Sequence, residues 1–89
     1  MPLVFIPSLM QNLTAGNKKV PVEGSNIRQV IENLDAEYPG IKSRLLDNDR
    51  IKLEISVAID GEISTLGMID KVSKNSEIHF LPAIAGGSI

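Results

Sequence analysis

Cysteine and tryptophan are absent from the 89-residue sequence, and aromatic residues make up only 3% of it. Without cysteine, the chain has no disulfide bond, no thiolate metal ligand and no cysteine nucleophile. Any sulfur chemistry in which it takes part must therefore use sulfur held on a group other than a side-chain thiol. Because 43% of the residues are hydrophobic, we expect one small domain with a core of leucine, isoleucine and valine.

The sequence also lacks an excess of positive charge and any long apolar segment. Its formal net charge is -2, which argues against a nucleic-acid partner and against a polybasic membrane anchor, because both need clustered lysine and arginine. The apolar residues 1–6 are too few for a membrane span, and Pro7 follows them, so they do not form a signal peptide. We expect a cytoplasmic protein that contacts neither nucleic acid nor membrane.

Two strands are expected near the N-terminus. Residues 3–6 are a continuous apolar run, which is typical of a strand inside a sheet. The loop that follows contains Leu9 and Leu13, whose spacing predicts one helical turn packed on the core. Residues 17–22 form the second strand. Because Pro21 has no N–H to donate to a sheet ladder, this strand should lie at an edge or start a bulge at the proline.

The clearest helix follows Ser25 and Asn26, either of which can cap its N-terminus with a side-chain oxygen. Apolar residues then recur at the spacing of helical turns and form one stripe: Ile27, Val30, Ile31 and Leu34. The Pro-Gly dipeptide at 39–40 ends this helix, and a short helical turn over residues 41–46 is expected next.

Strands dominate the second half of the chain. Apolar and polar residues alternate strictly over residues 51–59, which predicts one long strand with a buried and a solvated face. Asp60-Gly61 is the strongest hairpin signal of the chain and predicts a short return strand after it. Residues 76–82 form the last strand, with the side chains of Ile78 and Phe80 on its core face.

This order of two strands, a helix and three further strands predicts an α+β domain of the β-grasp (ubiquitin-like) type. A mixed sheet of four to five strands then carries one main amphipathic helix across one face, which buries the apolar stripes described above. We expect residues 1–82 to form this domain. Residues 83–89 carry no charged side chain and contain the Gly-Gly pair, so we expect them to form a flexible C-terminal tail.

The side chains give little support for catalysis or metal binding. His79 is the single histidine, has no acidic residue at a ligand spacing, and is interpreted as structural. Asp47, Asp49 and Arg50 fit a solvated turn. We therefore expect no catalytic residue, no bound metal and no bound cofactor. The pair Gly86-Gly87 is more informative, since glycine lets a backbone enter a slot too narrow for a side chain.

The segment from Ile78 to Gly87 resembles the C-terminus of the ThiS/MoaD family of ubiquitin-like sulfur carriers. Residues 34–41, with Arg44, Leu45 and Asp47 after them, look like the helix and turn of one member, the carrier of thiocarboxylate-dependent cysteine biosynthesis. The resemblance covers most of the chain and agrees with the predicted β-grasp order.

The resemblance implies a carrier protein and not an enzyme. In this family an E1-like adenylyltransferase uses ATP to activate the carboxyl group of the last glycine, and sulfur then replaces the nucleotide to leave a thiocarboxylate. On this chain the carboxyl group is that of Gly87, and Ala85 and Gly86 are the flexible residues before it. In the cysteine pathway the thiocarboxylate reacts on a pyridoxal-phosphate-dependent cysteine synthase, and a zinc metalloprotease releases the product.

The chain departs from the family because Ser88 and Ile89 follow Gly87. Two extended residues place a free carboxylate about 7 Å beyond Gly87, so an adenylation site built for Gly87 meets an unreactive amide. Some family members are made as precursors, and a JAMM-type zinc metalloprotease removes their short extension. We therefore predict a precursor that is cut between Gly87 and Ser88.

Three alternative functions stay open at this point. The same carrier chemistry serves the small subunit of molybdopterin synthase. A ubiquitin-like modifier instead joins its last glycine, here Gly87, to lysine side chains through isopeptide bonds. A β-grasp binding module with an inert tail uses none of this chemistry.

Partner binding must depend largely on the folded domain. Ordering residues 83–87 in a partner costs about 5–10 kcal/mol, at ~1–2 kcal/mol per residue, and two glycines offer little contact area in return. We therefore expect a docking surface at the end of the last strand, made by Leu81, Pro82 and His79.

Overall fold

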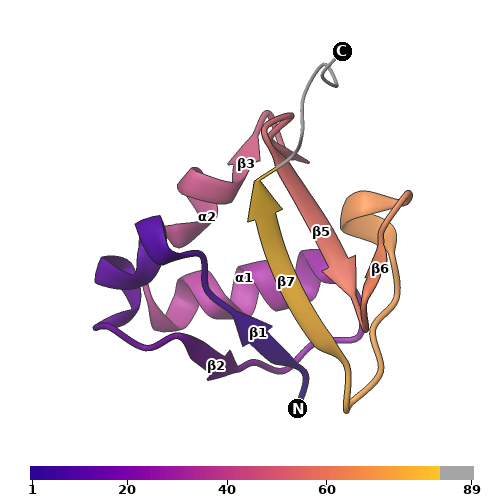
Figure 1. Ribbon diagram of the computed structural model, residues 1–89, viewed down its shortest axis with the longest axis horizontal. Helices are drawn as coiled ribbons and strands as arrows, with labels where there is room; N and C mark the ends of the chain where they lie inside the picture. Colours follow the sequence, from indigo (N-terminus) through magenta and orange to yellow (C-terminus); the bar gives the residue numbers. More distant parts are fainter. Residues whose placement is uncertain (83–89) are drawn as a thin grey trace.

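The computed structural model describes residues 1–82, which form a five-stranded mixed sheet with helices against one face (Figure 1). In chain order the elements are β1 (Leu3–Phe5), the 3₁₀ helix η1 (Ser8–Thr14), β2 (Lys19–Pro21), α1 (Ile27–Glu37), α2 (Ile41–Leu45), β3 (Leu46–Asp47), β4 (Arg50–Ile51), β5 (Ile55–Ile59), β6 (Glu62–Ile63), the 3₁₀ helix η2 (Gly67–Ile69) and β7 (Glu77–Pro82). The strand order in the main sheet is β2-β1-β7-β5-β6. β1 and β7 are parallel and the other neighbours are antiparallel, which confirms the predicted mixed sheet.

Helix α1 lies across one face of this sheet and buries the stripe predicted from the sequence. Its N-cap is Asn26, whose Oδ1 accepts a hydrogen bond from the backbone N–H of Gln29 at 2.8 Å. All four residues of the stripe are fully buried, in one core cluster with Val4, Val57 and Ile78. Burying an aliphatic side chain of this size contributes about 1.5–3 kcal/mol, so the stripe is the main attachment between helix and sheet.

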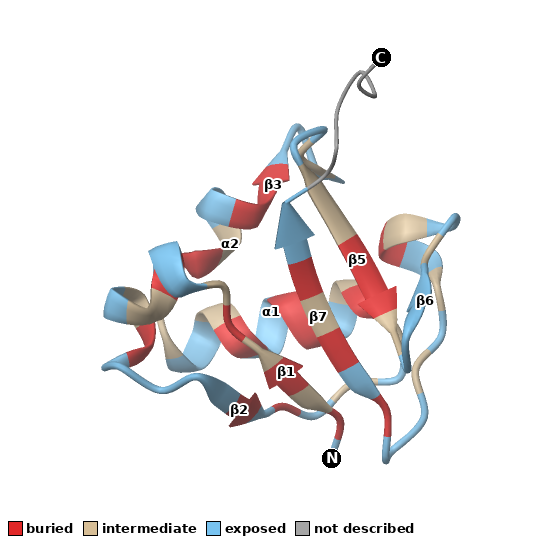
Figure 2. Ribbon diagram, in the orientation of Figure 1, coloured by how far each residue is buried: buried red, intermediate tan, exposed pale blue. Residues whose placement is uncertain are grey.

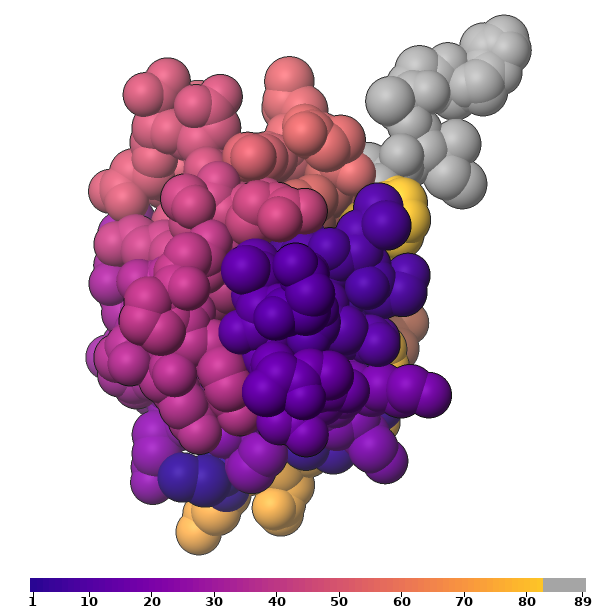
Figure 3. All heavy atoms as spheres, turned by 90° about the vertical axis from the view of Figure 1, so that its left-hand side faces the viewer, coloured from indigo at the N-terminus to yellow at the C-terminus, as the bar shows by residue number. Residues whose placement is uncertain are grey.

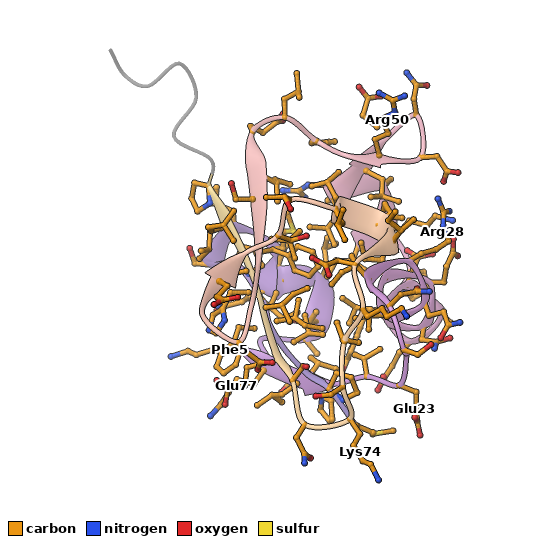
Figure 4. All side chains as sticks on the ribbon, turned by 90° about the vertical axis from the view of Figure 1, so that its right-hand side faces the viewer. Phe5, Glu23, Arg28, Arg50, Lys74 and Glu77 are labelled. Carbon is orange, nitrogen blue, oxygen red and sulfur yellow. The ribbon has the colours of Figure 1, made fainter. Side chains whose placement is uncertain are left out.

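The other face of the sheet carries no helix in the part of the chain that the structure describes (Figure 1). Phe5 and Glu77 lie on the sheet side of the molecule, opposite Arg28 of α1 (Figure 4). Along β7 the buried and more exposed residues alternate, as Figure 2 shows. The sheet therefore has a core face against α1 and an open face.

The edge-strand prediction and the hairpin prediction are both confirmed. β2, which contains Pro21, is at the end of the strand order and pairs only with β1, so its proline interrupts no ladder on a second side. Asp60 and Gly61 have φ angles of 53° and 89°, the left-handed conformations that a tight two-residue hairpin requires. They join β5 to β6.

The predicted strand over residues 51–59 is wrong in its first half. β4 pairs with β3 in a separate hairpin rather than continuing into β5. At its tip Asn48 and Asp49 have φ angles of 51° and 66°, conformations that these residue types tolerate better than most. The alternation of side chains continues through this change of partner, so the pattern alone predicts one strand.

A turn separates β4 from β5. The N–H of Ile55 donates to the carbonyl of Lys52 at 2.9 Å, which closes the turn. Leu53, which the alternation places on the core face, lies in this turn and is 93% exposed.

The prediction for the loop after β1 is also partly wrong. The loop forms η1, in which Met10 and Thr14 are buried and Leu9 is 83% exposed. Leu13 packs only partly against the core. A 3₁₀ helix has three residues per turn, so Met10 and Leu13, three residues apart, lie on the same side. Leu9 and Leu13 are four residues apart and therefore lie on different sides.

Gly24 lets the backbone before α1 lie close to Val30 in the first part of that helix. A Cβ at this position would lie 2.7 Å from Cγ2 of Val30 and 2.8 Å from its backbone nitrogen. Gly24→Ala should therefore lower the free energy of unfolding by about 2–4 kcal/mol, through overpacking and an unfavourable backbone conformation. Urea denaturation measures the change.

The matched control is Gly16→Ala. Gly16 also has a positive φ, of 82°, but no atom lies within 4 Å of the point that a Cβ would occupy there, so only about 1–2 kcal/mol of conformational cost is expected. Equal stability of the two variants would contradict the role assigned to the contact with Val30.

Candidate functional site

Strand β7 carries the chain from the centre of the sheet toward the C-terminal residues. β1 pairs with β7 only as far as His79, whereas β5 pairs with it as far as Pro82, opposite Ile55. The last residues of β7 therefore extend beyond β1 and are held in the sheet by β5. The segment that the sequence identifies as the tail begins at this fixed point.

The predicted reactive and processing residues lie outside the described residues. They are Ala85, Gly86, Gly87 and Ser88, all of which follow the last described residue, Pro82. Their roles stay predictions.

Of the three predicted docking residues, Leu81 and Pro82 lie at the end of β7, and His79 lies in the middle of the strand. Phe80 faces the core and is 3% exposed, whereas Leu81 is 39% exposed on the open face. Pro82 is exposed, and His79 is partly buried on the same face as Leu81. The predicted alternation of this strand is confirmed. The docking role itself is not tested by these positions.

His79 has a clear structural environment. Its ring stacks on Phe5 of the neighbouring strand, with 4.0 Å between centroids and 10° between planes. Lys19, from the strand beyond, places its Nζ 5.9 Å from the centroid of Phe5, within reach of a weak cation–π interaction. The stack joins β1 to β7 on the open face, and the parallel pairing that creates it could not be read from residue spacing.

The charged turn at Asp47, Asp49 and Arg50 forms the β3–β4 hairpin region. A carboxylate oxygen of Asp49 is 3.4 Å from Nη1 of Arg28, and both side chains are exposed, so this ion pair contributes at most about 1 kcal/mol. Within residues 1–82, no three His, Cys, Asp or Glu side chains come close enough together to hold a metal ion. In the same residues, no helix is both long and apolar enough to cross a membrane.

A groove beside the end of β7 was not predicted from the sequence. It measures about 590 Å³ and is lined by residues of η1, α2, the turn before β5, and the end of β7. Leu9 and Arg44 line it together with Leu81 and Pro82. We call it the tail-base groove. From the loop after β1, Pro7, Leu9 and Met10 line the groove. The sequence did not indicate this role for Leu9, because its spacing from Leu13 predicts a core position instead.

Comparisons with known proteins agree with this geometry. The model of the ThiS family matches residues 5–87. The sulfur carrier protein CysO of Mycobacterium tuberculosis is 29% identical over 89 residues, which covers 94% of this chain and 96% of the relative. CysO of Mycobacterium bovis is similar to the same extent, at 29% identity.

Solved structures show the same fold. A chain of the Amycolatopsis orientalis BexX/CysO complex has a TM-score of 0.90 at 28% identity, covering 98% of this chain and 100% of that chain. Mycobacterium tuberculosis CysO has a TM-score of 0.87 at 26% identity, covering 94% and 100%. The small archaeal modifier protein 1 of Methanosarcina acetivorans, with a TM-score of 0.77, 21% identity and coverage of 97% and 95%, supports the fold alone.

These relatives confirm the β-grasp prediction. The curated relatives are carrier proteins, which agrees with the prediction that the chain is not an enzyme. The family match spans almost the whole chain and ends at Gly87, the second glycine of the predicted reactive pair. The chain belongs to the ThiS family.

Proposed function

We propose that this protein is a sulfur carrier for cysteine biosynthesis, and that it becomes active when Ser88 and Ile89 are removed. The family match carries the proposal, because it runs to Gly87 and leaves the two following residues outside. The similarity to CysO supports a carrier role. A chain without cysteine can hold transferable sulfur at its terminal carboxyl group as a thiocarboxylate.

The chemistry proceeds on the carboxyl group of Gly87. A carboxylate oxygen attacks the α-phosphorus of ATP on an E1-like adenylyltransferase, which forms an acyl adenylate and releases pyrophosphate. Sulfide then attacks the carbonyl carbon, displaces AMP and loses its proton, which leaves the thiocarboxylate. ATP belongs to the activating enzyme, and the carrier itself binds no cofactor. Glycine suits this position because it has no side chain to block the approach to its carbonyl carbon.

Three partners follow from this sequence of reactions, which we place in the cytoplasm. A JAMM-type zinc metalloprotease cuts between Gly87 and Ser88, the E1-like enzyme charges Gly87, and a pyridoxal-phosphate-dependent cysteine synthase accepts the sulfur. The BexX/CysO complex supports the idea that a carrier of this shape acts while docked on another protein. Ala85 and Gly86 give the tail the flexibility to enter an active site.

A charging experiment tests the proposal. The chain ending at Gly87 and the chain ending at Ile89 are each incubated with the host's activating enzyme, ATP and a sulfide source. Intact-mass spectrometry should show replacement of one oxygen by sulfur in the shorter chain alone, because Gly87 of the longer chain is an amide.

Adding the host's metalloprotease should make the longer chain chargeable. If the shorter chain is not charged, the carrier proposal is wrong, and if the longer chain is charged directly at its own terminus, the processing step is wrong. An adduct to lysine would support the modifier alternative. A thiocarboxylate that serves only molybdopterin synthase would support the other carrier pathway.

Leu81→Asp should weaken binding to the activating enzyme without unfolding the domain. Leu81 is partly exposed, whereas its neighbour Phe80 lies in the core. We expect the aspartate variant to lose about 1 kcal/mol of stability or less, and Phe80→Ala to lose about 3–5 kcal/mol. Urea denaturation and a binding titration separate the two effects, and an unfolded Leu81→Asp variant would show that Leu81 belongs to the core.

A further inference from the structure

The tail-base groove lies where the tail begins. Pro82, the last described residue, is part of its lining, as is Leu81 before it. In Figure 3 the segment of η1, drawn in dark indigo, lies against the yellow end of β7, in agreement with the residues that line the groove. An enzyme that draws in residues 83–87 must therefore bring its own surface close to this groove.

The apolar part of the groove includes a leucine that is largely exposed to solvent. Phe80 and Ile55 contribute to its lining from the sheet, while Leu9 contributes from η1 and is 83% exposed. A leucine that projects into solvent at the rim is poorly suited to enclosing a small ligand, because such pockets bury most of the ligand surface. It is well suited to a protein interface, in which an exposed apolar side chain becomes covered.

The charged part of the groove is mainly positive. Arg44 and Lys52 line it together with one acidic residue, Glu54. No carboxylate of residues 1–82 lies within 4.0 Å of either cation's nitrogen atoms, since the two ion pairs of this part of the chain involve other residues. The groove is thus a local excess of positive charge on a chain with a net charge of -2, which favours an acidic docking segment.

We propose that the tail-base groove binds the activating enzyme through a segment that carries an apolar side chain beside a carboxylate. This inference rests on the proposed function and names the recognition surface for its first sulfur-transfer step. The acceptor enzyme can select its substrate by the thiocarboxylate. The activating enzyme meets an ordinary glycine carboxylate, so it has to distinguish the carrier by the folded domain.

The number of residues between the groove and Gly87 limits how far the docking segment can lie from the adenylation site. Five extended residues from Pro82 to Gly87 span about 17 Å at most. The docking segment of the enzyme should therefore lie within about 17 Å of the site where its ATP reacts. A segment farther away could not bind the groove while Gly87 is being adenylated.

Two substitutions in the chain ending at Gly87 test the proposal: Leu9→Asp and Arg44→Glu. Each has a control of the same chemistry at a distance from the groove. Ile69→Asp changes a 68% exposed residue of the other 3₁₀ helix, and Lys74→Glu reverses a charge at the end of the molecule away from β7's C-terminus (Figure 4). Steady-state release of pyrophosphate by the activating enzyme gives kcat and KM for each variant.

We expect each groove variant to raise KM at least tenfold with kcat little changed, because the lost contact is made equally in the ground state and the transition state. The KM of each control variant should stay within twofold of the KM of the parent chain. The KM of Arg44→Gln should lie between those of Arg44→Glu and the parent chain. This variant should also weaken the salt dependence of KM. Unfolding midpoints close to that of the parent establish that each variant is folded.

If the groove variants and the controls have the same KM, the docking proposal is wrong while the proposed function stands. A fall in kcat with unchanged KM would also overturn it, because the groove would then act in the reaction rather than in binding. If the unsubstituted chain ending at Gly87 is not charged, the proposed function itself fails.

Discussion

Strand β7 is paired with β5 along five consecutive residues, from Ile78 opposite Ile59 to Pro82 opposite Ile55. This pairing holds β7 in the middle of the sheet, and the positions of β1, the core and the last described residues depend on it. On its other side β7 pairs with β1, which ties the two ends of the described chain together in the middle of the sheet. Because the pairing with β5 continues to Pro82, the residues that follow start from a point fixed by the sheet.

The same strand contributes both to the core and to the exposed surface at the end of the sheet. Ile78 and Phe80 are buried with the stripe of α1 in an aliphatic core, so the domain needs neither cysteine nor many aromatic residues to fold. Leu81 and Pro82 face solvent beside Leu9 and Arg44. A seven-residue segment with two glycines and no charged side chain offers little contact area, so in the proposed function the specificity comes from the surface where that segment begins.

Local patterns in the sequence are enough to predict much of this fold. The stripe from Ile27 to Leu34 and the Asp60-Gly61 turn depend on near neighbours, and both are as predicted. The predicted strand over 51–59 is wrong because alternation does not record which strand is the partner, and the Asn48-Asp49 turn is a weaker signal than Asp-Gly. The pairing of β1 with β7 joins distant parts of the chain, and no residue spacing encodes it.

The candidate site is predictable to a similar extent. Gly86-Gly87 and Leu81 stand out in the sequence through a motif and an alternation, both local. Leu9 and Arg44 do not, because their position beside Leu81 depends on how η1 and α2 pack. Residues that form a contiguous surface only after folding cannot be found from spacing, whereas a local motif such as Gly86-Gly87 can.

The mass of the C-terminus in the native host tests the central claim most directly. The carrier should be isolated under conditions where cysteine synthesis runs and analysed as the intact protein. We predict a chain that ends at Gly87, with a fraction in which sulfur replaces one oxygen of the terminal carboxyl group. A chain that retains Ser88 and Ile89 throughout, with no thiocarboxylate, would contradict the account.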